Sequence, residues 1–165
     1  MTRFVQEMLQ AAVSQVGVQE VPKGSNRGPQ VSKYLASVGL NPGYAWCMAF
    51  VYWCAQQAEI SLKEPNPLVR TAGVMKQWLS IPGKYKHPNP LPGDIFIMSF
   101  GHGTGHTGFV TDIHINGTFD TIEGNSNSDG SREGYEVCRH CRTTRSVHGF
   151  IRIYPEQIAV ATVEL

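Results

Sequence analysis

The 165-residue chain has little net charge, because 14 Lys and Arg residues balance 13 Asp and Glu residues. Proteins that bind nucleic acids or anionic membranes usually present an excess of basic residues. We therefore expect neither kind of partner. No stretch reaches the roughly 18 apolar residues of a membrane span, and Glu7 and the glutamines near it interrupt what would be the apolar core of a signal peptide. The sequence thus predicts no membrane segment and no export signal.

Cysteine is also sparse, with only four residues, at 47, 54, 138 and 141. Their spacing is unlike the dense disulfide framework of small secreted proteins, and a chain of this length can bury a core without disulfides. We find no internal repeat, low-complexity tract or linker. We therefore expect one domain over residues 1–165.

Apolar residues recur at helical spacing in the first half of the chain. This pattern predicts helices over 4–16 and 31–38, an almost uniformly apolar central helix over 46–58, and a weaker one over 71–79. From Pro92 onward the period changes to two, which predicts strands over 94–99, 107–115, 118–122, 135–138 and 150–153. The prediction is an α+β domain in which N-terminal helices pack on a C-terminal antiparallel β-sheet.

The central helix begins in the stretch YAWCMAFVYWC, at residues 44–54. Cys47 lies in the first turn of this helix, where the helix dipole and free backbone N–H groups favour a thiolate. The same N–H groups can hold the oxyanion that forms when a thiolate attacks an amide carbonyl. Cys54, two turns further along, is expected to be a core residue. Cys47 is therefore the candidate nucleophile.

The candidate base is His106, in the phrase GHTGFV before an Asn116-Gly117 turn. A two-residue turn there would place Gly108 opposite Asn125 and would leave Glu123 about 13 Å from His106 along the strand. A direct contact between His106 and Glu123 requires a longer loop or a bulge that shifts the register, and we expect such a shift. Alternation predicts one polar face and one core face for this hairpin. The polar face contains His106, Gly108, Val110, Glu123 and Asn125. The core face contains Phe109, Ile113, Ile115 and Ile122.

The ordered motifs resemble those of the CHAP family of cysteine, histidine-dependent amidohydrolases and peptidases. The resemblance is carried by the segment from SQVGVQEVPKG to YAWCMAFVYWC, followed by LPGDIFIM, GHTGFV, TIEGN and GFIRI. It implies a papain-like α+β fold and cleavage of an amide bond in the peptide part of bacterial peptidoglycan. It also implies that Cys47 is the nucleophile, His106 the general base and then acid, Glu123 the group that orients His106, and Asn125 a further polar support.

Three more residues are candidates for contact with the substrate. Tyr44 and Trp46 shortly precede Cys47 and could flank the scissile bond, although framework roles in the central helix are the alternative. His102 precedes His106 by four residues and could line the rim of the cleft or act as a rival base. The other histidines are expected to be structural or exposed.

No cofactor is expected. Some CHAP domains bind calcium through an aspartate-rich loop near the N-terminus, but the loop PKGSNRG has no aspartate, so we expect no calcium and no catalytic metal. The sequence Cys138-Arg-His-Cys141 is the rival motif, because CxxC is typical of zinc or thiol-redox sites, and incidental strand cysteines are the third possibility. A non-catalytic wall-binding module with the same fold also stays open.

The resemblance implies peptidoglycan as the partner and action outside the cytoplasmic membrane, in the periplasm or cell wall. A monomer is expected. The cut could lie between sugar and peptide, within the peptide stem or at a cross-bridge, and the source could be a phage lysin, a secreted effector or a wall-remodelling enzyme.

Overall fold

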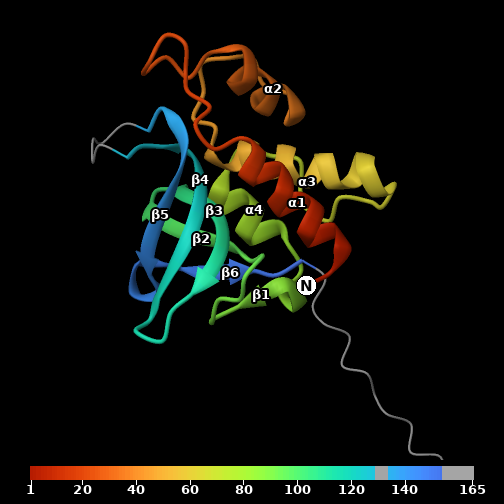
Figure 1. Cartoon of the computed structure of the whole chain (residues 1–165), viewed down its shortest axis with the longest axis vertical. Helices are drawn as coiled ribbons and strands as arrows, with labels where there is room; N and C mark the ends of the chain where they lie inside the picture. The colour runs from red at the N-terminus through yellow and green to blue at the C-terminus, as the bar shows by residue number, and fades with distance from the viewer. Residues whose placement is uncertain (129–133, 154–165) are drawn as a thin grey trace, which may run out of the picture.

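A computed structural model describes residues 1–128 and 134–153, within which four α-helices are followed by a six-stranded antiparallel sheet (Figure 1). The helices are α1 (Arg3–Ser14), α2 (Pro29–Ser37), α3 (Cys47–Leu62) and α4 (Val74–Ser80). The strands are β1 (Lys86–His87), β2 (Ile95–Gly101), β3 (Thr104–Ile113), β4 (Thr118–Ser126), β5 (Glu136–Thr143) and β6 (Gly149–Ile151), with short 3-10 turns at Gly83–Tyr85 and Thr144–Ser146. The predicted α+β class is confirmed.

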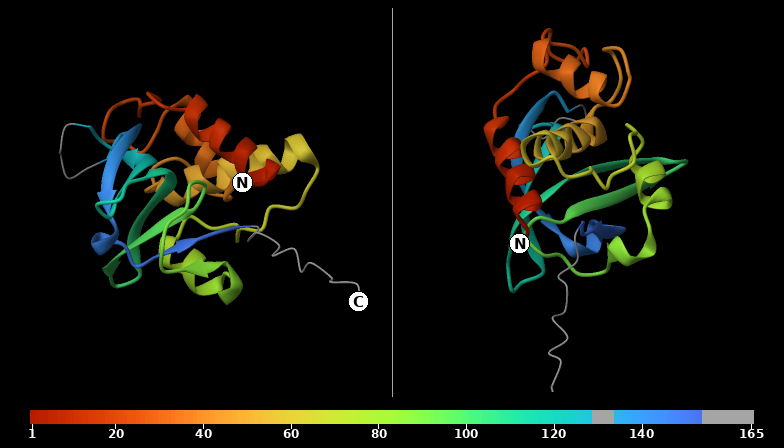
Figure 2. Two further views of the ribbon diagram at one scale, coloured as in Figure 1. Left: turned by 60° about the horizontal axis from the view of Figure 1, so that its bottom comes forward. Right: turned by 90° about the vertical axis from the view of Figure 1, so that its right-hand side faces the viewer.

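Helix α3 is the centre of the molecule. It contains no Gly or Pro, and nine of its side chains are buried, so it is covered almost all round. Helix α1 packs along it, and both helices lie on one side of the sheet (Figure 2). Tyr34 of α2 stacks on Trp46 just before α3 and makes edge contacts with Phe50 and Trp53. These contacts hold the first turn of α3 in place.

The sheet has the strand order β1-β6-β2-β3-β4-β5, and both of its faces bury apolar side chains. The face toward the helices carries Phe109 and Ile122, which belong to the main core, whereas a second cluster lies on the opposite face. That second cluster consists of Phe96, Val110, Phe119 and Phe150. The alternation predicted for the hairpin is therefore correct near its middle, but its polar face also contains a small core.

The predicted two-residue turn at Asn116-Gly117 is wrong. Ile113 pairs with Phe119, so the connection is longer, and only Gly117 has a positive φ, whereas a type I′ turn needs one at both central residues. Instead, the Asn116 side chain accepts hydrogen bonds from Thr118. The predicted core positions Ile113 and Ile115 are exposed because this end of the hairpin extends away from α3 (Figure 1).

The expected register shift is present. A bulge between Val110 and Asp112 changes the β3–β4 pairing, after which Val110 faces Thr121 and Phe109 faces Ile122. Continuing this register places Gly108 beside Glu123, two residues closer to His106 than the simple turn would. Among the described residues, no helix combines the length and apolar character that a membrane span requires.

Candidate active site

Cys47 is the first residue of α3, and its residue surface is only 6% exposed. The first helical hydrogen bond runs from the Phe50 N–H to the Trp46 carbonyl, at 2.8 Å. Within the described part of the chain, no side chain caps the start of this helix. The N–H groups of the first turn and the positive end of the helix dipole are therefore directed to the region of the Cys47 thiol.

His106, on β3, lies between this thiol and a carboxylate. Its Nε2 is 2.7 Å from Oε2 of Glu123, and the Cys47 thiol lies near enough to the imidazole to affect its pKa. Burial lowers the pKa of His106, but the hydrogen bonds and charges of Cys47 and Glu123 outweigh burial and raise this pKa to about 9. His106 is therefore favoured in its protonated form at neutral pH.

Glu123, on β4, is completely buried and is held by four side chains. Arg142 of β5 donates to both carboxylate oxygens, at 2.8 Å from Nε and 2.6 Å from its terminal nitrogen, while hydroxyls of Thr121 and Ser126 donate at 2.6 and 3.2 Å. Burial raises the pKa of Glu123, but the bonds and charges of Arg142 and His106 lower it well below its usual range. A buried carboxylate thus stays ionised beside His106.

Two glycines of the sequence motifs make this geometry possible. A Cβ on Gly108 would lie 2.6 Å from the Ile122 carbonyl oxygen and 2.9 Å from Cγ of Glu123, so the missing side chain leaves room for the carboxylate. A Cβ on Gly124 would lie 2.7 Å from the Phe50 side chain. The first glycine lets Glu123 reach His106, and the second lets β4 approach the start of α3.

Asn125 is positioned to hold the backbone next to Cys47. With its amide oriented so that both ends are satisfied, its oxygen accepts from the Trp46 N–H at 3.2 Å and its nitrogen donates to the Gly134 carbonyl at 2.9 Å. Asn125 has a φ of 52°, a left-handed conformation that asparagine tolerates better than most residues. Its hydrogen bonds therefore join β4 to the residue that precedes the thiol.

Comparison with known proteins adds a decisive observation: residues 39–125, more than half of the chain, match the CHAP domain. The chain belongs to the CHAP family. This matched segment contains Cys47, His106, Glu123 and Asn125. No curated protein matches significantly.

The solved structure of Ly7917 shares the fold of this CHAP domain. Ly7917 is similar with a TM-score of 0.53 and 16% identity, over 92% of this chain and 62% of that chain. The endolysin LysIME-EF1 gives a TM-score of 0.48 and 20% identity, over 92% of this chain and 65% of that chain. The chain therefore spans less than two thirds of either protein.

The three predicted substrate contacts differ in accessibility. Tyr44 is 56% exposed, just before α3, and His102 is exposed in the β2–β3 turn with a φ of 50°. Trp46 is completely buried, and its indole N–H donates to Glu20 at 2.8 Å. The burial of Trp46 favours the framework role that was the alternative to a substrate contact, because its ring has no exposed surface.

Arg142 is the site residue that the sequence reasoning missed. The predicted strand ended at Cys138, whereas β5 continues to Thr143. Had the strand been extended, alternation would have placed Arg142 on the same face as Cys138, which pairs directly with Glu123. The available signal was that Arg142 lies four positions after Cys138, the residue that pairs with the buried Glu123.

The CxxC alternative of Cys138 and Cys141 is not supported by the geometry of β5. Side chains three positions apart in a strand point to opposite faces, and their Cα atoms are about 10 Å apart, beyond the reach of a disulfide. Both thiols are free. Cys138 lies 3.3 Å from Nε2 of His140, and burial raises the pKa of Cys138 to about 11. Cys138 and Cys141 therefore cannot share one metal ion or form a local redox pair.

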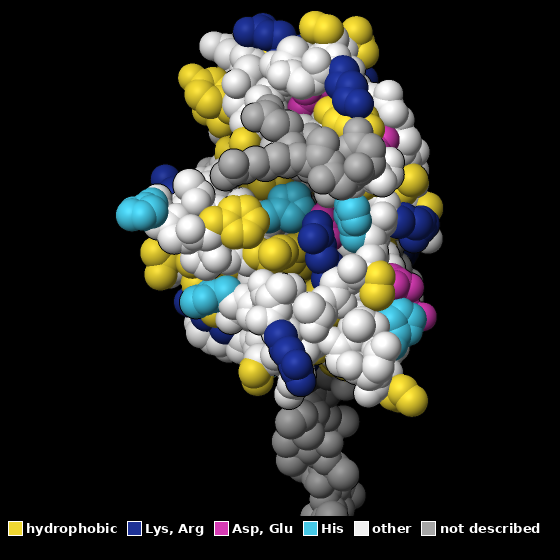
Figure 3. All heavy atoms as spheres, turned by 90° about the vertical axis from the view of Figure 1, so that its left-hand side faces the viewer, with side chains coloured by type: hydrophobic (Ala, Val, Ile, Leu, Met, Phe, Trp, Pro, Cys, Tyr) yellow, Lys and Arg dark blue, Asp and Glu magenta, His cyan; other side chains and the backbone are white. Residues whose placement is uncertain are grey.

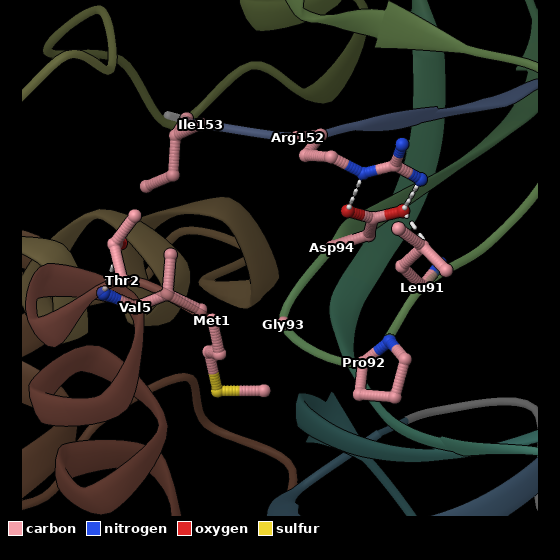
Figure 4. Close-up of a pocket in the computed structure, with 9 residues that line it drawn as sticks. All are labelled: Met1, Thr2, Val5, Leu91, Pro92, Gly93, Asp94, Arg152 and Ile153. Atoms are coloured by element: carbon pink, nitrogen blue, oxygen red, sulfur yellow. Dashed lines mark hydrogen bonds and ion pairs between the residues drawn. The ribbon is translucent and has the colours of Figure 1, made fainter. Parts of the chain in front are cut away.

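The surface agrees with this placement of the chemistry. In the view of Figure 3, histidine side chains gather with a Lys or Arg, an acidic group and hydrophobic side chains near the centre of one face. A pocket of about 420 Å³ lies elsewhere, between α1 and the start of β2 (Figure 4). Its polar part is the ion pair of Asp94 and Arg152, and its lining includes no cysteine or histidine.

Proposed function

We propose that this CHAP domain is a peptidoglycan hydrolase that cleaves an amide bond with Cys47 as its nucleophile. The observation that carries the proposal is the placement of His106 beside both the Cys47 thiol and the Glu123 carboxylate. A thiol beside an imidazole whose tautomer is fixed by a carboxylate is the arrangement used for acyl transfer by cysteine hydrolases. Membership of the CHAP family supports peptidoglycan as the substrate class.

The proposed reactive form of the site is a thiolate–imidazolium pair, which forms when the Cys47 proton passes to His106. Glu123 engages Nε2 of His106, so Nδ1 is the nitrogen left for exchange with Cys47 and with the substrate. The Cys47 sulfur attacks the scissile carbonyl carbon, and the carbonyl π electrons move to its oxygen. The free N–H groups at the start of α3 stabilise that oxyanion.

The intermediate then collapses as the carbon–nitrogen bond breaks. Protonated His106 gives its proton to the departing amine, and the remaining acyl group is held as a thioester on Cys47. His106, now neutral, accepts a proton from an attacking water molecule. The carbon–sulfur bond breaks, a carboxylic acid leaves, and the thiolate–imidazolium pair is restored.

The surrounding residues have positioning roles. Glu123 orients His106 and stabilises its positive charge, and Arg142 keeps Glu123 ionised and fixed. Asn125 holds the Trp46 backbone through its amide. Exposed Tyr44 and His102 are proposed to contact the peptide near the scissile bond, because they lie close in sequence to Cys47 and His106.

We further propose that residues 1–165 act as a single catalytic domain and as a monomer, outside the cytoplasmic membrane, where peptidoglycan is found. The catalytic groups do not determine which amide is cut, since binding of the flanking sugar and peptide selects the bond. An amidase that cuts between sugar and peptide and an endopeptidase are therefore both compatible with the same mechanism.

Digestion of purified cell walls followed by mass spectrometry of the fragments tests this function. An amidase would release a new amine on alanine together with free sugar chains, and an endopeptidase would shorten stems or open cross-bridges. The Cys138→Ser variant serves as a thiol control that should keep activity. Walls left intact by the wild-type protein, or digested equally by Cys47→Ala, would reject the proposal.

A further inference from the structure

A second group of metal-binding side chains lies at the far end of the hairpin. His114, Asp120 and Cys141 each offer one ligand atom, and these three atoms lie within 4.8 Å of one another. Nε2 of His114 is 3.2 Å from Oδ1 of Asp120. None of these residues takes part in the proposed mechanism, so their proximity needs a separate account.

Backbone pairing fixes the positions of these ligands. Asp120 on β4 is directly opposite Cys141 on β5, so both side chains leave the sheet on the same face. His114 follows β3, and its backbone N–H donates to the Thr118 carbonyl at 2.9 Å. The three donors are therefore carried by a hydrogen-bonded hairpin and its neighbouring strand rather than by a free loop.

Two carboxylates face each other beside this cluster. Asp112 pairs directly with Asp120 across β3 and β4, and like charges that face each other in this way are destabilising. A divalent cation beside Asp120 would reduce that repulsion. A hollow of about 320 Å³ adjoins the cluster, lined by Thr111, Asp120, Thr121, Arg139, His140 and Cys141, and leaves space for water on a bound ion.

The donor set selects the kind of metal. Ca²⁺ and Mg²⁺ prefer oxygen ligands alone, whereas a thiolate, an imidazole and a carboxylate together suit Zn²⁺. In a tetrahedral zinc site with bonds of about 2.0–2.3 Å, ligand atoms are about 3.3–3.8 Å apart. The observed His114–Asp120 separation is already close to that range, and rotation of exposed side chains can bring Cys141 to the same distance.

We propose that His114, Asp120 and Cys141 bind one Zn²⁺ ion, with water completing its coordination. The Cys141 thiol releases its proton to solvent as the zinc–sulfur bond forms. The ion ties the β3–β4 turn to β5, next to Arg142, which holds Glu123. This site does not involve Cys138, which faces the other side of the sheet.

Zinc binding to the full chain tests the proposal by competition with a chromophoric chelator. We expect one Zn²⁺ per chain, and a thiolate-to-metal absorption band when Co²⁺ replaces Zn²⁺. Cys141→Ser should abolish that band, and both Cys141→Ser and His114→Gln should weaken zinc binding at least about tenfold, because each removes one of three protein ligands. Both changes are at exposed positions, so the variants should stay folded by circular dichroism.

Two matched controls locate the ion. Cys47→Ala removes the thiol of the candidate active site, and Cys138→Ser removes the buried thiol of the same strand; both should bind zinc as the wild type does. The proposal is overturned if no zinc binds, or if binding is unchanged in Cys141→Ser and lost in Cys47→Ala. In the second case, the zinc would belong to the Cys47–His106 pair. Because the readout is metal binding, failure of this proposal leaves the hydrolase proposal intact.

Discussion

Replacement of Glu123 by Gln tests how the fold controls His106. Burial lowers the pKa of His106, but Cys47 and Glu123 outweigh burial, and the net rise from 6.5 to about 9 corresponds to about 3 kcal/mol at about 1.4 kcal/mol per pKa unit. Because the folded-state pKa is raised, this stabilisation is complete below pH 6.5 and is lost as the pH rises through 9. Replacing the Glu123 carboxylate should therefore lower the free energy of unfolding by the part of this stabilisation that Glu123 contributes, about 1–2 kcal/mol.

The measurement combines an NMR titration of the His106 imidazole with urea unfolding at pH 6 and pH 10. In Glu123→Gln we expect the pKa of His106 to fall well below 9, because burial lowers this pKa and the carboxylate that raises it is gone. The free energy of unfolding should also decline less between the two pH values than in the wild type. Turnover should drop at least about 100-fold, since general acid–base catalysis contributes that much.

Asp94→Asn is the matched control. Asp94 is also a buried carboxylate that accepts two hydrogen bonds from an arginine, Arg152, but it contacts neither Cys47 nor His106 in the bonds described. This variant should lose stability yet keep the wild-type titration of His106. The reasoning is refuted if His106 keeps a pKa near 9 in Glu123→Gln, or if Asp94→Asn lowers it equally.

Three further predictions concern the surroundings of the site. Arg142→Lys keeps the positive charge but loses the pair of hydrogen bonds to Glu123, so the free energy of unfolding in urea should fall by about 1–3 kcal/mol. The control Arg139→Lys, at an exposed position of the same strand, should leave this free energy unchanged. Asn125→Gly permits the positive φ but removes the amide, so dye release from labelled walls should slow several-fold while the melting temperature changes little. Cys54→Ala should cost about 1–2 kcal/mol in urea unfolding because Cys54 is completely buried, and undiminished dye release would separate it from the catalytic thiol.

Local pattern was sufficient for the part of the site that lies on α3. A dense apolar run without Gly or Pro predicts a buried helix, and the structure begins that helix at Cys47, within one residue of the predicted start. The glycines of GHTG and EGN likewise indicate close approach of backbones. Helical spacing and small residues are properties of neighbouring positions, so sequence alone reveals them.

The contacts that activate His106 depend on the register of β3 against β4. The alternation pattern predicted that His106 and Glu123 share a face of the hairpin, but it did not predict how close together they lie. Asn116-Gly117 is compatible with more than one turn, because Asn116 can form the turn with its side chain instead of a positive φ. The bulge after Val110 then sets how close Glu123 comes to His106. Bulges arise from the packing of whole strands, so no local signal gave its position.

Long-range pairing explains the remaining differences. Arg142 reaches Glu123 because β5 lies beside β4, and the same pairing directs Cys138 toward the site and Cys141 away from it. A CxxC motif can have the same amino-acid sequence in a loop and in a strand. In a loop its two thiols can converge, whereas in a strand they point to opposite faces. The secondary structure around Cys138 and Cys141 therefore decides the meaning of the motif.

Competition among the four thiols for limiting iodoacetamide tests the central claim most directly. Cys141 is exposed and Cys47 is nearly buried, so accessibility alone predicts that Cys141 is labelled first. A thiolate–imidazolium pair with His106 predicts the reverse at pH 6.5: Cys47 is alkylated first, and wall hydrolysis is lost in proportion to its labelling. Preferential labelling of Cys141, or hydrolysis that persists after complete alkylation of Cys47, would contradict the account.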